Sequence, residues 1–168
     1  MRRLKMKVNT LRFGTLDVSE DQLFEFPMGI LGFSNLKSFF IIEREETRPF
    51  KWLQSVDDPS TAFVIGDPLL FIPSYQAEVR RVDIPHLDPI VDEKDLVLSV
   101  IMTITPDPQN ISANLLAPII INLANRRGMQ YILNDKRYPV RYFLFKNEDV
   151  ITPPISGDQG ELRSLALR

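Results

Sequence analysis

The chain has no cysteine and a single histidine among its 168 residues. Without cysteine, disulfide bonds, thiolate zinc sites and cysteine nucleophiles are excluded, and the composition is compatible with a reducing compartment. The lone histidine, His86, lies between a proline and a leucine in a turn-forming segment, so a metal site rich in nitrogen ligands is excluded as well. We therefore expect neither a metal nor another cofactor.

Long apolar runs are also missing. No stretch of about 18 apolar residues is present, so we expect no transmembrane helix and no membrane partner. The basic start, Arg2–Lys7, is not followed by an apolar segment and lacks the pattern of a secretory signal peptide, which predicts a cytoplasmic protein. The net charge of −2 gives no overall attraction to nucleic acid.

Catalytic motifs are absent from the sequence. No serine lies in a nucleophile-elbow pattern. Asp57 and Asp58 are adjacent, and adjacent side chains of a strand point apart, so they would not flank one scissile bond. We interpret them as turn residues before Pro59. Gly29 and Gly32 lack the spacing of a phosphate-binding loop. The sequence therefore predicts a protein that is not an enzyme.

Proline, in contrast, is abundant, with 13 residues that disfavour long helices. Short runs of β-type residues recur between proline and glycine turns, and this punctuation predicts an antiparallel barrel or sandwich. We expect a mostly β, small antiparallel β-barrel-like single domain over residues 1–150 with little helix. The expected strands are Lys7–Phe13, Leu16–Val18, Leu23–Phe26, Phe39–Glu43, Lys51–Ser55, Ala62–Ile65, Leu96–Thr105 and Tyr138–Phe145.

Three segments fit this pattern less well. Asn35–Phe39 is predicted to form one helical turn after Ser34, and Ala77–Val82 is either a short helix or a strand edge. Residues 151–168 contain two prolines and two glycines and are expected to form a flexible tail, although their leucines leave open a tail that docks on the barrel.

The pattern between residues 114 and 133 predicts a β-hairpin. Two apolar runs, Pro118–Leu123 and Met129–Leu133, flank the polar connection Ala-Asn-Arg-Arg-Gly. Gly128 is expected to take the left-handed backbone conformation of a tight reversal. Asn114 and Asn122 bracket the first run, and we expect their amides to bond to the backbone.

Negative charge is concentrated in the segment Asp83–Asp95, called the acidic segment below, where Lys94 is the single positive residue. Such a run is usually a solvated face, but it can also steer a basic partner. Its acidic residues are Asp83, Asp88, Asp92, Glu93 and Asp95.

The motifs taken together resemble the FliW family of flagellar assembly factors, over Lys7 to about Val150. They are the segment FxFPMGILGF at Phe24–Phe33, then Lys51–Ser55, Asp57-Asp58-Pro59, Phe63, Asp67-Pro68, Asn114–Ile119, Asn122, Gly128–Gln130 and Tyr138–Arg141. The resemblance implies a small monomeric β-barrel protein that binds two partners, flagellin and the translational regulator CsrA. In the family, the FliW protein keeps CsrA from repressing flagellin mRNA, and newly made flagellin competes for it.

The resemblance and the charge pattern together suggest two partner surfaces. The acidic segment is complementary to a basic regulator, and an apolar groove suits an amphipathic flagellin helix. The candidate anchors, if their segment is an exposed loop, are Met28, Ile30, Leu31 and Phe33; if the segment packs inward, it closes the barrel. The structural motif comprises Gly29, Gly32, Asn114, Pro118, Asn122 and Gly128. A barrel that binds RNA, through Arg126, Arg127 and Arg137, or a small ligand remains the alternative.

Overall fold

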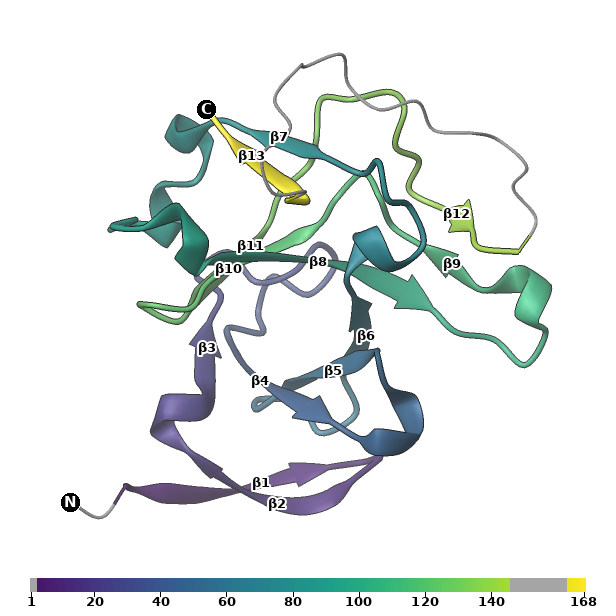
Figure 1. Cartoon of the computed structure of the whole chain (residues 1–168). Coiled ribbons are helices and arrows are strands. Elements are labelled where there is room, and N and C mark those ends of the chain that lie inside the picture. The colour runs from purple at the N-terminus through teal and green to yellow at the C-terminus, as the bar shows by residue number, and fades with distance from the viewer. Residues whose placement is uncertain (1–2, 146–162) are drawn as a thin grey trace.

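Seven strands close into a barrel in the computed structural model, which describes residues 3–145 and 163–168 (Figure 1). Their order is β10-β11-β3-β4-β5-β6-β8, and β8 pairs again with β10. Neighbours are antiparallel except β11 and β3, which run parallel. The expected mostly β barrel is confirmed. The strands are β3 (Leu23–Glu25), β4 (Ser38–Glu43), β5 (Lys51–Ser55), β6 (Ala62–Gly66), β8 (Leu96–Thr103), β10 (Ile119–Asn122) and β11 (Arg127–Gln130).

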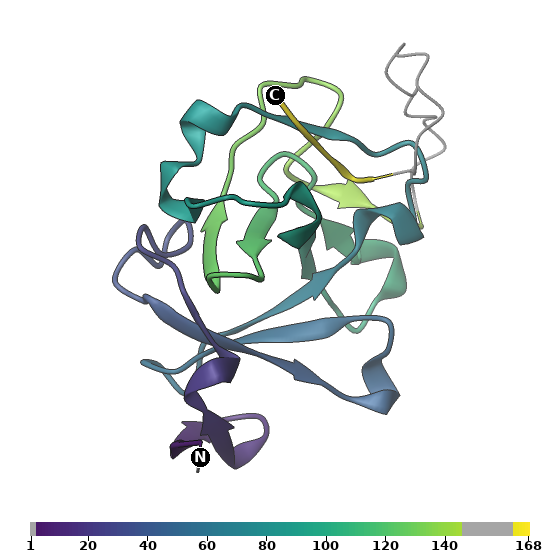
Figure 2. The same cartoon turned by 60° about the vertical axis from the view of Figure 1, so that its left-hand side comes forward.

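Smaller strand pairs cover the barrel. The hairpin of β1 (Lys5–Thr10) and β2 (Gly14–Ser19) lies at one end, and the parallel pair β7 (Ala77–Val79) and β13 (Leu165–Leu167) lies at the other (Figures 1 and 2). β9 (Ser112–Ala113) and β12 (Tyr142–Phe143) extend the sheet beyond β8. Helix in the described ranges is limited to three-residue 3-10 turns. They are η1 (Glu20–Gln22), η2 (Glu45–Thr47), η3 (Pro68–Leu70), η4 (Arg81–Asp83), η5 (Pro85–Leu87), η6 (Glu93–Asp95) and η7 (Pro108–Asn110).

The core consists of three apolar clusters that share strands. Side chains alternate along a strand, so β10 places Ile119 and Ile121 in one cluster and Ile120 in another. Strand β4 likewise divides Phe39 and Phe40 between two clusters. The cluster with Ile119 and Ile121 fills the barrel. The cluster with Phe40 lies under the β1–β2 hairpin, and the cluster with Ile120 lies under β7. Strands buried on both faces explain why apolar residues here are consecutive rather than alternating.

Several expected elements differ from the structure. The helical turn expected at Asn35–Phe39 is wrong, because Leu36 closes a turn on the Phe33 carbonyl and the chain extends into β4. Ala77–Val82 is a strand followed by η4. The strand expected at Tyr138–Phe145 is shortened to β12, because Tyr138 turns inward and its ring packs 4.5 Å from that of Tyr75.

The C-terminal end is a further correction. The expected flexible tail is wrong for its last residues, because β13 pairs with β7 and Leu165 is buried in the core. This pairing corresponds to the open alternative of a docked tail. Residues 151–162 lie outside the described residues.

The hairpin reversal uses a different residue from the one expected. Arg126 takes the left-handed conformation, with φ of 56°, and the φ of Gly128 lies outside that region. Gly128 is instead needed for space: an added Cβ would lie 2.4 Å from the Phe26 ring. Phe26 is fully buried and packs edge-on against Phe39, so the ring cannot easily move.

Two asparagine side chains hold backbone near this hairpin. Asn114 Oδ1 accepts a hydrogen bond from Ala117 N at 3.0 Å. Asn122 is almost fully buried and its amide donates to the carbonyls of Leu87 and Pro89, at 2.9 and 3.2 Å. The bonds of Asn122 connect the acidic segment to the end of β10.

We expect Gly128→Ala to destabilise the protein by about 1–3 kcal/mol, the usual cost of overpacking a filled core. Chemical denaturation should show this loss. In the Phe26→Leu background, which makes room, the same substitution should cost clearly less. Equal costs in both backgrounds would show that the ring contact does not determine the effect.

We expect Asn122→Ala to cost about 1–3 kcal/mol, because the Pro89 carbonyl loses this donor and the buried Leu87 carbonyl keeps only that of Asn125. Thermal unfolding measures this, with exposed Asn134→Ala as the control. An unchanged midpoint together with lost partner binding would make Asn122 a contact residue instead.

Candidate partner-binding surface

An open groove of about 510 Å³ lies between two segments that are far apart in the sequence. One wall is the loop that follows β3, with Met28 to Gly32, and the other is formed by η4 and η5, with Val82 and His86. Strand β11 adds a methionine and a glutamine between them. The lining residues are Met28, Gly29, Ile30, Leu31, Gly32, Ser34, Val82, Asp83, Pro85, His86, Met129 and Gln130. The groove brings together the two sequence segments proposed as partner surfaces.

The loop is a rigid pair of turns. Gly29 N donates to the Phe26 carbonyl and Phe33 N to the Ile30 carbonyl. Gly29 and Gly32 both have positive φ, 66° and 84°, and a Cβ on Gly29 would lie 2.6 Å from the Phe33 carbonyl oxygen. Glycine is therefore required at position 29 for both conformation and space.

This geometry corrects one of the candidate anchors. Ile30 is 2% exposed and packs inside the barrel, so the expectation that it contacts a partner is wrong. Met28 and Leu31 are 60% and 58% exposed. Phe33 is partly exposed, and its ring packs edge-on against Phe63. Both alternatives from the sequence are therefore realised in one loop: Ile30 packs inward and closes the barrel, and its neighbours face solvent.

Sequence reasoning named Leu31, which lies between the two turn glycines with its side chain outside, but it missed other groove residues. Val82 is 79% exposed, whereas Ile84, two residues on, is fully buried. His86, expected in a loop, lies in η5 and lines the groove. No local pattern indicated that it would face the loop after β3.

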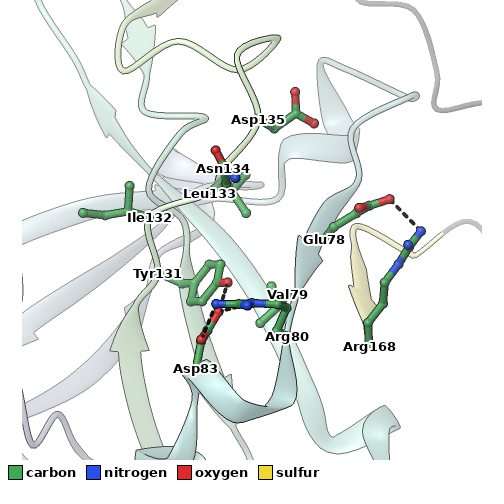
Figure 3. A pocket seen from close by; sticks show the side chains of 10 residues that line it. All are labelled: Glu78, Val79, Arg80, Asp83, Tyr131, Ile132, Leu133, Asn134, Asp135 and Arg168. Atoms are coloured by element: carbon green, nitrogen blue, oxygen red, sulfur yellow. Dashed lines mark hydrogen bonds and ion pairs between the residues drawn. The ribbon is translucent and has the colours of Figure 1, made fainter.

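The acidic segment is less negative than its sequence suggests. Arg80 donates two hydrogen bonds to the Asp83 carboxylate, at 2.8 and 2.9 Å, and Tyr131 donates a third (Figure 3). These bonds, led by those from Arg80, lower the pKa of Asp83. Arg81 lies 3.9 Å from Asp88. Arginines outside the acidic run therefore compensate its first two carboxylates.

The remaining acids form the exposed part of this surface. Asp92 and Glu93 are exposed, and Asp95 is half-buried. Asp92 Oδ1 accepts a hydrogen bond from Lys94 N and so caps η6. The position of η6 is set by Leu123 N, which donates to the Asp95 carbonyl at 2.9 Å. Asp92 and Glu93 are therefore the carboxylates best placed to meet a basic partner.

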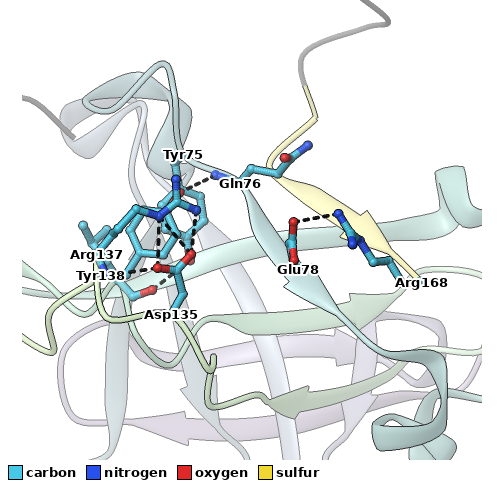
Figure 4. Close-up of polar contacts among 8 residues, drawn as sticks. Tyr75, Gln76, Glu78, Asp135, Arg137, Tyr138 and Arg168 are labelled. Atoms are coloured by element: carbon cyan, nitrogen blue, oxygen red, sulfur yellow. Dashed lines mark hydrogen bonds and ion pairs between the residues drawn. The ribbon is translucent and has the colours of Figure 1, made fainter. Parts of the chain in front are cut away.

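A second hollow, of about 530 Å³, lies between β7 and the segment Tyr131–Asp135 (Figure 3). Its charged groups are neutralised by one another. Besides Arg80 and Asp83, Arg168 pairs with Glu78 at 2.8 Å. Asp135 accepts hydrogen bonds from Arg137, which lower the pKa of Asp135 (Figure 4). The pKa values of Asp83 and Asp135 are therefore both displaced downward, away from neutral pH.

The basic residues of the RNA-binding alternative are dispersed as well. Arg127 lies 3.9 Å from Glu25, and Arg137 is bonded to Asp135. Both guanidinium groups thus face a carboxylate, and Arg126 lines a separate small hollow together with Glu20 and Asp21. Within residues 3–145 and 163–168, no group of three or more histidine, cysteine or acidic side chains could hold a metal ion. No helix in those ranges is long and apolar enough to cross a membrane.

Comparison with known proteins is consistent across three kinds of evidence. The model of the FliW protein family matches residues 7–144. A flagellar assembly factor FliW of Syntrophus aciditrophicus is 40% identical over 146 residues, which cover 87% of this chain and 92% of the relative. One from Caldicellulosiruptor saccharolyticus is 43% identical over 143 residues, covering 85% of this chain and 93% of the relative.

A solved structure agrees with these relatives. The crystal structure of a flagellar assembly factor FliW superimposes with a TM-score of 0.77 at 33% identity, covering 86% of this chain and all of the other. The family model matches most of the chain, and the relatives match it over nearly their whole length. The chain therefore belongs to the FliW family of flagellar assembly factors.

Proposed function

We propose that this chain is a cytoplasmic, monomeric and non-enzymatic regulatory adaptor with two competing partners. It binds CsrA, which relieves repression of flagellin mRNA, and it binds flagellin, which displaces CsrA. This role couples flagellin synthesis to flagellar assembly. The observation that carries the proposal is the apolar groove beside the acidic segment, in a chain of the FliW family.

The groove suits an amphipathic helix of flagellin. Three exposed apolar side chains, Met28, Leu31 and Val82, stand on its two walls. An amphipathic helix can lay its apolar face between such walls, and the side chains then leave water on binding. The rigid turns of the loop reduce the entropy lost when a partner docks.

The acidic surface suits a basic regulator, through the exposed carboxylates of Asp92 and Glu93. Charges at the rim of an interface mainly accelerate association and select the partner. The groove and the acidic segment share one residue, Asp83 of η4, while Asp92 and Glu93 are not among the groove residues. Competition in this proposal arises because a protein bound at one surface extends over the edge of the other.

Reversing Asp92 and Glu93 to lysine should weaken CsrA binding by roughly 1 kcal/mol at low salt and by less at high salt, because salt screens exposed charges. Flagellin binding should stay nearly unchanged. Calorimetric titrations with each partner at two ionic strengths measure this. Since Asp92 caps η6, the pair Asp92→Asn and Glu93→Gln tests the charges with a capping side chain kept.

The control is the double reversal of Glu45 and Glu46, an exposed acidic pair in η2 near the hairpin end. It changes the net charge by the same amount. If this control weakens CsrA binding equally, the effect is one of net charge and the acidic segment is not the contact surface.

Leu31→Ala and Met28→Ala should each weaken flagellin binding with little change in stability, because both side chains are exposed. Ile30→Ala should instead lower stability by about 2–5 kcal/mol, because it empties a core position. Denaturation and flagellin titration separate the two effects. Leu11→Ala is the matched control, 80% exposed at the hairpin end. Flagellin binding that resists both loop substitutions would remove the groove from the proposal.

A further inference from the structure

The C-terminal strand β13 is attached to the molecule differently from the barrel strands. It pairs with β7 alone, in a two-stranded parallel sheet separate from the barrel (Figure 1). An isolated pair of strands is marginally stable, and parallel pairing is slightly weaker than antiparallel pairing. The attachment of β13 therefore depends on what its side chains contact.

The backbone contacts of β13 belong to the edge of β7 rather than to a particular sequence. Ala77 N donates to the Ser164 carbonyl at 2.7 Å, and Arg81 N donates to the Arg168 carbonyl at 2.7 Å. In return, Arg168 N donates to the Val79 carbonyl at 2.9 Å. Any extended chain that runs parallel to β7 can make these bonds, because they involve no side chain.

The side chains of β13 enter contacts of defined chemistry. Leu165 is 6% exposed within the core, and Leu167, two residues on, packs at its border, while Ala166 points to the other face. Arg168 pairs with Glu78 at 2.8 Å (Figure 4). The edge of β7 thus offers two apolar sockets two residues apart, followed by a carboxylate.

We propose that the edge of β7 is a docking site for an extended peptide of a partner protein with the pattern Leu-x-Leu-Arg, and that β13 occupies this site as a displaceable intramolecular ligand. Charge complementarity at Glu78 and the leucine sockets define the partner chemistry. The Arg168–Glu78 pair is largely solvent-exposed, so it holds β13 weakly. Tethering supplies an effective concentration on the millimolar scale that a competing peptide must overcome.

Displacement would also reach the acidic segment. Arg163, which precedes β13, donates to the carbonyls of Glu93 and Leu96, at 3.0 and 3.3 Å. Removing β13 takes this donor away from η6. The docking site itself lies on β7 and does not rest on the proposed function, so a failure of the CsrA and flagellin experiments would leave it testable.

The first test uses a fluorescent peptide with the sequence of residues 163–168, Arg-Ser-Leu-Ala-Leu-Arg. Full-length Leu165→Asp, whose own strand no longer fits the socket, should bind it at least tenfold more tightly than the unaltered protein. The Leu11→Asp protein, changed at the opposite end, should bind it like the unaltered protein. A peptide with aspartate in place of its first leucine should not bind. Equal affinity for Leu165→Asp and the unaltered protein, or no binding to either, would overturn the proposal.

The second test needs no substitution and follows amide exchange by NMR. With excess peptide, the Arg168 amide of the unaltered protein should lose protection, while those of Ala77 and Arg81 stay protected by the incoming strand. Unchanged protection at Arg168 would show that β13 is a permanent strand and would overturn the proposal. Light scattering supplies one more outcome: a concentration-dependent dimer that Leu165→Asp abolishes would assign the site to a second copy of this chain instead of a partner.

Discussion

The double-sided burial of β10 is the constraint on which the rest of the structure depends. This strand pairs with β8 on one side and β11 on the other, and it closes the barrel. Ile119 and Ile121 face the barrel interior, and Ile120 faces the outer cluster beneath β7. A slip of one residue would exchange the two faces, so pairing and packing select the same register.

The candidate binding surface is built outward from the ends of this strand. At one end, Asn122 holds the carbonyls of Leu87 and Pro89 and so places the acidic segment. At the other, Gln130 of β11 donates to the Ala117 carbonyl and accepts from Leu31 N, which places the loop after β3. The acidic segment and the loop after β3 are thus both positioned by buried or half-buried side-chain amides. A binding surface held in this way is rigid without requiring long helices.

Electrostatics at this surface depend on contacts between distant segments. Counted along the sequence, the acidic run has one compensating lysine, but in three dimensions Arg80, Arg81 and Arg163 contact it. The exposed negative charge is therefore concentrated at Asp92 and Glu93. Partner recognition by the acidic segment, as proposed above, would then depend on these two residues, and Arg163, which precedes β13, contacts the same part of the segment.

Strand positions and fold class were determined by local properties of the sequence. Proline punctuation and β-branched runs located the strands of the barrel, because local propensity and burial agree there. Lys51–Ser55 matches β5 at both ends. The hairpin reversal was misassigned because glycine has two uses: Gly128 is required by the Phe26 ring at the end of the neighbouring strand β3, and the left-handed residue is Arg126. Phe26 and Gly128 are far apart in the sequence, so no local pattern contains that contact.

At the candidate binding surface, too, local sequence patterns and contacts between distant residues determined different features. The sequence by itself identified the FPMGILGF loop and the acidic run as the two segments of interest. Only the tertiary structure decided which of their side chains are available, since Ile30 fills the barrel while Leu31 remains outside. It also decided that the end of the chain is a strand, because β13 has an apolar socket and a free strand edge to occupy only after β7 is in place. Burial and strand pairing are properties of contacts between distant residues, and those contacts exist only in the folded chain.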